Sequence, residues 1–239
     1  MDLLDQAPTV FLLSPAIATG RRALQLAAPR ASFAAAGRLR SPEGLPIGEA
    51  FCFMSALYFR GKLAYARRFA SACAGPPVLP EQSGWRGERS GERSSVDLQL
   101  VPDAGSILII APGFGLVSPE WPLTAERLRR LARTPVDPAR RVYSAPLRRH
   151  ARELASRLPA AARIVLLGSI ATGKYLDLLA PIFGDRLLFP RAFVGAGDMR
   201  RGSLLLRAAR LGEELEYAGL ESPRRTPRPP AASVCPGDP

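Results

Sequence analysis

Three short runs of apolar residues divide the chain, and each of them ends in small or turn-forming residues. The runs cover residues 10–13, 106–111 and 164–167. Continuous runs rich in Ile, Val and Leu are typical of strands that are buried on both faces. Segments with helical periodicity lie between them, so the pattern predicts an α/β fold. We expect a three-layer sandwich in which a mostly parallel central sheet carries helices on both faces.

Apolar stripes and capping residues locate the helices between these strands. We expect helices over 48–72 with a break at Gly61, over 125–133 with Thr124 as N-cap, over 145–158 with Ser144 as N-cap, and over 175–183. Two further short runs, 187–189 and 214–217, are additional candidates for strands.

The length and composition predict one domain with two disordered segments. A chain of 239 residues can bury one substantial core, which we assign to a single α/β domain over 1–220. Residues 75–95 are rich in Pro, Gly, Glu, Arg and Ser and predict a disordered loop insertion, and residues 221–239 predict a disordered Pro/Arg-rich tail. Neither segment has enough apolar surface to offset the entropy of ordering.

Several classes of protein are disfavoured by the sequence. No run of about 18 apolar residues is present, which argues against a membrane span. The acidic start, Met1-Asp2-Leu3-Leu4-Asp5, is unlike a signal peptide, so we expect a cytoplasmic protein. Cys52, Cys73 and Cys235 have neither disulfide nor zinc spacing, and we expect no metal and no cofactor.

The net charge of +12 is typical of a nucleic-acid-binding protein, but it has a second explanation. Nearly all of the basic residues are Arg, and Lys occurs only at 62 and 174, a bias that a GC-rich genome would also produce. Residues 58–69 interleave basic and aromatic side chains, which makes them the best local candidate for nucleic-acid contact. Helical spacing also puts Tyr58 and Tyr65 near an apolar face, so core packing is the favoured alternative.

The segment after the third apolar run predicts an anion-binding turn. Gly168 and Gly173-Lys174 have the spacing of a P-loop, except that Tyr175 stands where Ser or Thr would hold Mg²⁺. Backbone N–H groups at a helix N-terminus attract negative charge, so this turn is a candidate site for phosphate. The alternative is a tight strand-to-helix turn with a solvated Lys174.

Ligands bind parallel α/β sheets beyond the carboxyl ends of the strands, so we expect the segments that follow the strands starting at Val10, Ile107 and Ile164 to meet in one crevice. Phe114 is a candidate for stacking on a planar ring there, or else an aromatic that fills the core. The candidate ligand-binding residues are therefore Ser14, Gly113, Phe114, Gly115, Gly168, Ser169, Thr172, Gly173 and Lys174.

Candidates for catalysis are few. Glu43 and Asp198 lie in turns and are the carboxylates that we assign to proton transfer, which requires one of them to face the crevice with a raised pKa. His150, the single histidine, sits among arginines and is expected on the solvated side of its helix. No Ser-His-Asp or Cys-His arrangement is apparent.

Several motifs together resemble a bacterial protein family that is itself uncharacterised. They are Ser14-Pro15, Ser41-Pro42-Glu43-Gly44, Leu57-Tyr58-Phe59-Arg60-Gly61-Lys62, the run from Gly168 to Tyr175, and Asp185-Arg186-Leu187-Leu188-Phe189-Pro190. More remotely, Val165-Leu166-Leu167-Gly168-Ser169-Ile170-Ala171 resembles the late strand and helix of uracil-DNA-glycosylase-like domains. That resemblance implies an α/β fold, but the catalytic motifs of those enzymes are missing here.

Three functions remain open on the sequence alone. The leading hypothesis is a domain that binds a nucleotide, a base or nucleic acid through the Lys174 turn. The second is an enzyme that acts on a nucleobase or nucleotide, such as a glycosylase-like hydrolase. The third is a non-catalytic protein-interaction module that recruits a partner through its Arg-rich tail.

Overall fold

The computed structural model describes residues 7–55, 57–70 and 106–219. The strands are β1 (Thr9–Leu13), β2 (Leu45–Pro46), β3 (Ile107–Ala111), β4 (Gly115–Val117), β5 (Pro122–Leu123), β6 (Arg163–Leu167), β7 (Leu187–Pro190) and β8 (Tyr217–Ala218). The α-helices are α1 (Arg21–Ala27), α2 (Ala34–Arg40), α3 (Ile47–Ser55), α4 (Leu57–Phe69), α5 (Ala125–Arg133), α6 (Arg141–Arg157), α7 (Gly173–Phe183) and α8 (Asp198–Leu211). Two 3₁₀ turns, η1 (Gly184–Arg186) and η2 (Arg191–Phe193), flank β7. The predicted loop 75–95 and tail 221–239 lie outside the described residues.

Six strands form a mainly parallel sheet in the order β4-β3-β1-β6-β7-β8. The three apolar runs are its central strands: β1 runs parallel to both β3 and β6, and β6 runs parallel to β7. The short edge strands β4 and β8 are antiparallel to their neighbours. The predicted α/β class and mostly parallel sheet are therefore confirmed.

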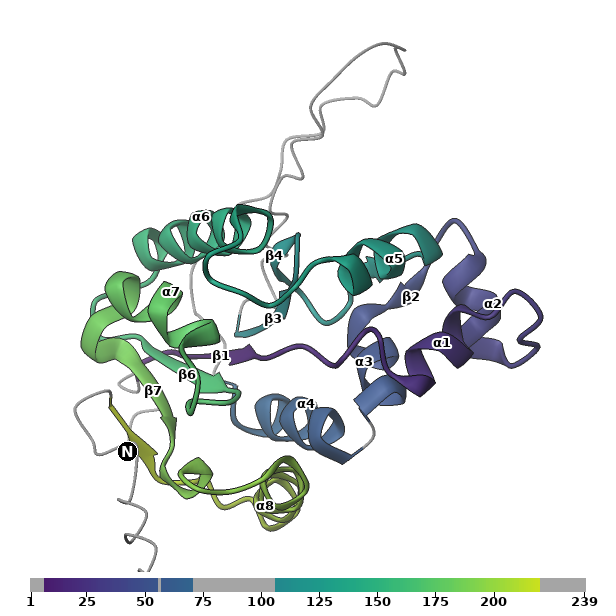
Figure 1. Ribbon diagram of the computed structural model, residues 1–239. Coiled ribbons are helices and arrows are strands. Elements are labelled where there is room, and N and C mark those ends of the chain that lie inside the picture. The colour runs from purple at the N-terminus through teal and green to yellow at the C-terminus, as the bar shows by residue number, and fades with distance from the viewer. Residues whose placement is uncertain (1–6, 56, 71–105, 220–239) are drawn as a thin grey trace, which may run out of the picture.

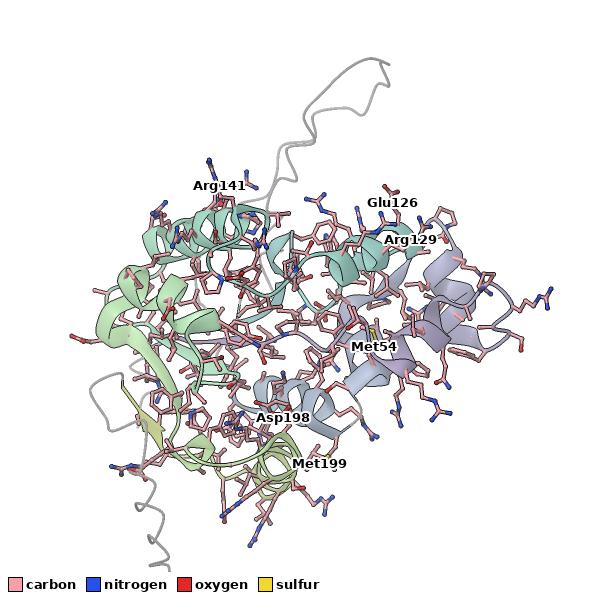
Figure 2. All side chains as sticks on the ribbon, viewed as in Figure 1. Met54, Glu126, Arg129, Arg141, Asp198 and Met199 are labelled. Carbon is pink, nitrogen blue, oxygen red and sulfur yellow. The ribbon has the colours of Figure 1, made fainter. Side chains whose placement is uncertain are left out.

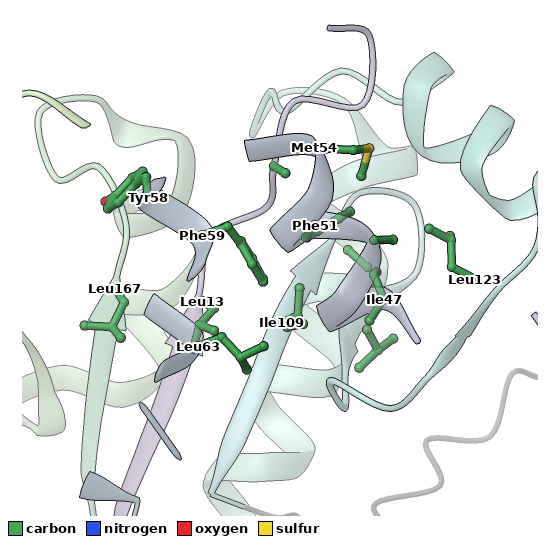
Figure 3. Close-up of a cluster of buried hydrophobic side chains, with 14 of the residues drawn as sticks. Leu13, Ile47, Phe51, Met54, Tyr58, Phe59, Leu63, Ile109, Leu123 and Leu167 are labelled. Carbon is green, nitrogen blue, oxygen red and sulfur yellow. The ribbon is translucent and has the colours of Figure 1, made fainter. Parts of the chain in front are cut away.

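Alternate residues of the central strands pack on opposite sides of the sheet. Leu13 and its neighbours Ile109 and Leu167 contact apolar side chains of α3 and α4, among them Phe51 and Phe59, as Figure 3 shows. The other set, which includes Val10 and Leu12, packs against α6 and α7. Figure 1 shows α6 and α7 on one side of β1 and α4 and α8 on the other.

Helices α4 and α8 approach each other through glycine. A Cβ atom on Gly61 would lie 2.7 Å from the carbonyl oxygen of Gly202, and one on Gly202 would lie 2.9 Å from the Cα of Tyr58. The predicted break at Gly61 is therefore wrong: Gly61 lies within α4 and serves this close contact.

The other helix boundaries follow local capping. Thr124 caps α5 as predicted, because its Oγ1 accepts a hydrogen bond from the Arg127 N–H at 3.3 Å. Ser144 is not an N-cap: α6 begins at Arg141, and the Ser144 hydroxyl donates to the Arg140 carbonyl at 3.1 Å. A serine hydroxyl can satisfy a carbonyl one turn back, which lets it sit inside a helix. Among the described residues, no helix is long and apolar enough to cross a lipid bilayer.

The crossing of α4 and α8 makes a testable prediction. We expect Gly61→Ala to lower the free energy of unfolding by about 1–3 kcal/mol, because the new methyl group would overlap backbone that cannot move away alone. The measurement is urea denaturation of the full chain.

Gly37→Ala in α2 is the matched control for this substitution. A Cβ there meets no atom within 4 Å, and Gly37 is likewise inside a helix. Alanine should therefore stabilise the chain at this position by up to about 1 kcal/mol. Equal effects at both positions would mean that the α4–α8 contact does not constrain the fold.

Candidate functional site

A cavity of about 280 Å³ lies where the segments after three parallel strands meet. Residues 15–19 follow β1, Pro112 follows β3, and Lys174 and Tyr175 follow β6. Side chains of α5 and the segment after it, including Leu131 and Thr134, close the remaining wall. The cavity lies at the carboxyl ends of the parallel strands, where the sequence pattern predicts a crevice.

Lys174 is the one charged residue among the described residues that line this cavity. Its side chain is exposed, and its backbone carbonyl accepts a hydrogen bond from the Tyr143 hydroxyl at 3.0 Å, which ties the turn to α6. The rest of the lining is apolar apart from the hydroxyls of two threonines and Tyr175. The cavity therefore combines an apolar body with a single cation at the rim.

The N-terminus of α7 already has a carboxylate beside it. A Cβ on Gly173 would lie 2.0 Å from Oδ2 of Asp177, so this side chain covers the first turn of the helix. Thr172, the N-cap residue, makes no capping hydrogen bond with its side chain, and Ser169 is half-buried in the same loop. Because a carboxylate here occupies the positive end of the helix dipole, an incoming anion would meet Lys174 rather than a vacant helix end.

A second group of polar side chains lies at the carboxyl end of β1, within the protein. Lys62 of α4 is 1% exposed, and its Nζ lies 2.7 Å from the carbonyl oxygen of Ser14 and 2.9 Å from the Ser14 Oγ. The rings of Tyr58 and Phe59 lie 4.3 Å and 4.9 Å from the same nitrogen. A lysine is almost never fully buried unless such partners satisfy it.

Burial changes the acidity of this lysine. Loss of hydration disfavours the charged amine and lowers the pKa of Lys62 to about 7; Asp198 and Cys52 act in the opposite direction, and Arg201 reinforces the decrease. An amine with a pKa near 7 carries a free lone pair on a large fraction of molecules at neutral pH, which an ordinary surface lysine does not. Lys62 is therefore able to accept a proton.

Two buried polar groups close to Lys62, the Tyr58 hydroxyl and Arg201 Nε, make no well-formed hydrogen bond among the described residues, although the Arg201 side chain interacts with the Tyr58 hydroxyl. Both side chains are more than nine-tenths buried. The other nitrogens of Arg201 are used, because NH2 donates to the Phe193 carbonyl at 3.2 Å and NH1 lies 3.5 Å from Asp198. An unsatisfied buried polar atom costs about 1–3 kcal/mol, so these two donors need a reason to be there.

Ser14 is held between β6 and α7 as well as against α4. A Cβ on Gly168 would lie 2.9 Å from the Ser14 Cβ, so glycine at the end of β6 makes room for the serine. The Ser14 side chain lies close enough to the Tyr175 hydroxyl to lower the pKa of this tyrosine, while burial, the larger effect, raises it. Because Tyr175 also lines the cavity, it connects the cavity to the Ser14–Lys62 pair.

The second candidate loop faces a different cavity. Gly113 and Phe114 line a space of about 380 Å³ together with Arg130 and Arg149. The Phe114 ring is 7% exposed, lies 5.0 Å from Trp121 and is covered by the Arg130 guanidinium at 4.5 Å. These contacts favour the alternative in which Phe114 fills the core beneath its loop.

Gly115 and His150 form a packing contact rather than a binding site. A Cβ on Gly115 would lie 2.5 Å from His150 Nδ1, which accepts a hydrogen bond from the Leu116 N–H at 3.1 Å. The expectation of a solvated His150 is therefore wrong: the ring is 2% exposed, and burial lowers its pKa. Glycine at 115 allows the ring to approach the backbone, which the sequence pattern does not reveal.

The two candidate carboxylates differ in their surroundings. Glu43 is exposed, and hydrogen bonds from its own backbone and the Ser41 side chain lower its pKa, the opposite of the direction that catalysis would require. Asp198 is also largely exposed, at the start of α8 (Figure 2), but its charge is felt by both Lys62 and Tyr175. Among the described residues, no group of three or more His, Cys, Asp or Glu side chains could hold a metal ion.

The sequence pattern does not reveal the Ser14–Lys62 pair, although each residue stands out in it separately. Lys62 is one of two lysines in a chain whose basic residues are otherwise arginine, and it lies one helical turn after Tyr58. That isolated lysine on an apolar helix face was the available signal. The core-packing alternative for this segment is confirmed at Tyr58 and Tyr65, which are buried, and Phe69 is partly buried against the same core.

No protein-family model, curated protein or solved structure matches this chain. The resemblance to uracil-DNA-glycosylase-like domains therefore stays a prediction.

The buried lysine predicts how stability depends on pH. The folded chain holds the Lys62 pKa near 7, whereas the unfolded chain returns it to about 10.5, so between these values the unfolded state binds more protons. The free energy of unfolding should therefore rise with pH across this window, by up to about 1.4 kcal/mol per pH unit from this group.

The measurement is urea denaturation of the native chain and of Lys62→Met at pH 7, 8 and 9. The difference in stability between them should grow in favour of lysine as the pH rises, because methionine does not titrate. A difference that stays constant with pH would show that Lys62 keeps an ordinary pKa.

Proposed function

We propose that this protein binds a nucleotide or a nucleobase in the cavity at the carboxyl ends of β1, β3 and β6. The observation that carries the proposal is the lining of that cavity, in which Lys174 supplies the single charge at the rim of an otherwise apolar space. A planar base suits apolar walls with a few hydroxyl groups, and a phosphate suits the lysine.

The order of the strands supports this location. The chain leaves β1, enters β3 on one side and later enters β6 on the other side, so β1 stands at a topological switch point. Ligands of open α/β sheets bind at such points. We also propose that the fold is a three-layer sandwich. Helices would then cover both faces of the sheet, and the edge at the carboxyl ends of the strands would stay open to a ligand.

The size of the cavity favours a small ligand. Its volume of about 280 Å³ lies just below the usual range for small-molecule sites, about 300–1,000 Å³. A free base or a mononucleotide fits that volume, and a base from a nucleic-acid strand would have to enter unpaired. The Lys174 ammonium would bind the phosphate by charge, since Asp177 covers the first turn of α7.

The proposal is tested by thermal-shift measurements on the full chain with AMP, UMP, adenine, uracil, inorganic phosphate and a short oligonucleotide. A probe at about 100 times its Kd should stabilise the folded chain by about 2.7 kcal/mol. Lys174→Ala should remove the stabilisation by the phosphate-bearing probes without unfolding the protein, and it should leave any effect of the free bases in place.

Two variants control this experiment. Arg129→Ala removes a positive charge from the exposed side of α5, seen in Figure 2, and should change nothing. Ala132→Phe fills the cavity and should abolish binding of every probe. Stabilisation by no probe, or stabilisation that survives Ala132→Phe, would refute the proposal.

A further inference from the structure

The buried side chains at the end of β1 form a chemical arrangement that ligand binding does not require. Binding of a nucleotide in the cavity needs Lys174 and the apolar walls. It does not need a serine hydroxyl 2.9 Å from a buried amine, nor a buried tyrosine hydroxyl and guanidinium beside that amine. We propose that Ser14 is a nucleophile and Lys62 its general base in the hydrolysis of a carboxylic ester or amide.

The geometry fits the neutral form of the amine. A neutral lysine has two N–H bonds and one lone pair. One N–H can donate to the Ser14 carbonyl at 2.7 Å, while the lone pair accepts the Ser14 hydroxyl proton across 2.9 Å. This is the distance required between a nucleophile and its base. The lowered pKa of Lys62 makes that protonation state accessible at neutral pH.

The reaction divides into two balanced steps. As the Ser14 Oγ–C bond forms, the hydroxyl proton moves to Lys62 Nζ and the carbonyl electron pair moves to the carbonyl oxygen. Collapse of this intermediate breaks the bond to the leaving group, which takes the proton from Lys62, and the acyl group remains on Ser14. A water molecule then repeats the sequence, with Lys62 taking and returning its proton, and releases the carboxylic acid.

The Tyr58 hydroxyl and Arg201 Nε are the donors that we assign to such an intermediate. Negative charge develops on the carbonyl oxygen, and preorganised buried donors stabilise it. The Tyr58 hydroxyl and Arg201 Nε belong to the same buried cluster, since the Tyr58 ring lies 4.3 Å from Lys62 Nζ and Arg201 acts on the pKa of both residues. The Arg201 side chain also interacts with the Tyr58 hydroxyl, so the two groups would act on the carbonyl oxygen as a pair.

The acyl group would reach Ser14 from the cavity described above. Pro15 and Ala16, which follow Ser14 in the chain, line that cavity, and so does Tyr175, whose pKa responds to the Ser14 side chain. The Ser14 residue itself is 5% exposed, so a substrate must enter past Tyr175 to touch the hydroxyl. A small acyl group is therefore the substrate class that this site would accept.

Titratable and charged groups surround Lys62 on several helices. Asp198 and Arg201 face it from α8 with opposite signs, Cys52 faces it from α3, and Tyr58 shares its helix. Tyr175 approaches from α7 through Ser14. With these groups in place, the acylation rate should rise with pH and level off above a midpoint near 7, where Lys62 loses its proton.

The test combines a covalent probe with hydrolysis of a small ester by the full chain. A fluorophosphonate should form an adduct at Ser14, located by peptide mass spectrometry, and p-nitrophenyl acetate should be hydrolysed with the pH midpoint given above. Ser14→Ala should abolish both, while the matched Ser203→Ala, on the exposed side of α8, should leave both unchanged. Lys62→Met should slow acylation by about 100-fold or more.

A second variant keeps the proposal falsifiable if Lys62→Met fails to fold. In Ser14→Cys, iodoacetamide should alkylate the new thiol faster than Cys52 of the same chain, with a pH dependence that reports Lys62. No adduct at Ser14 in the native chain, together with an unreactive thiol in the Ser14→Cys variant, would show that this position cannot be reached and would overturn the proposal. This inference does not rest on nucleotide binding: Lys174→Ala would lose phosphate-bearing ligands yet keep the Ser14 adduct.

Discussion

The contact between the Lys62 amine and Ser14 fixes how helix α4 sits on the central strand. The amine binds both the carbonyl and the hydroxyl of the residue that follows β1, so it sets the height of α4 along that strand. Helix α8 then packs on α4 through Gly61 and Gly202, where the two backbones leave no room for a Cβ. Displacement of the amine would therefore move two helices as well as one side chain.

This contact also decides the polarity of the carboxyl edge of the sheet. Burying an amine costs hydration energy, which the fold offsets with two hydrogen bonds and two aromatic rings. A leucine at position 62 would remove that cost without leaving a charge to neutralise. The buried lysine therefore adds less to stability than its contacts suggest, because the same contacts must first offset the loss of its hydration.

The sequence was sufficient for the sheet and insufficient for the site. The three central strands were predictable because strands buried on both faces must be apolar at successive positions, as 164–167 are. The burial of Lys62 was not predictable, because a single lysine among arginines is expected to be solvated, and only the packing of α4 on β1 shows that it is buried. The predictions of a helix break at Gly61 and of a solvated His150 were wrong for a related reason. In the sequence, a glycine that makes room for another backbone or ring cannot be distinguished from a glycine that breaks a helix or ends a strand.

Tyr175 explains the departure of this chain from the P-loop pattern. In a P-loop this position carries a hydroxyl close to the backbone, where it can hold Mg²⁺ beside the phosphates. Here a tyrosine in the first turn of α7 is buried near the Ser14 side chain and forms part of the cavity wall. The neighbouring Lys174 stays exposed at the rim of the same cavity. One turn therefore presents a cation to the outside of the cavity and a hydroxyl to its inner end.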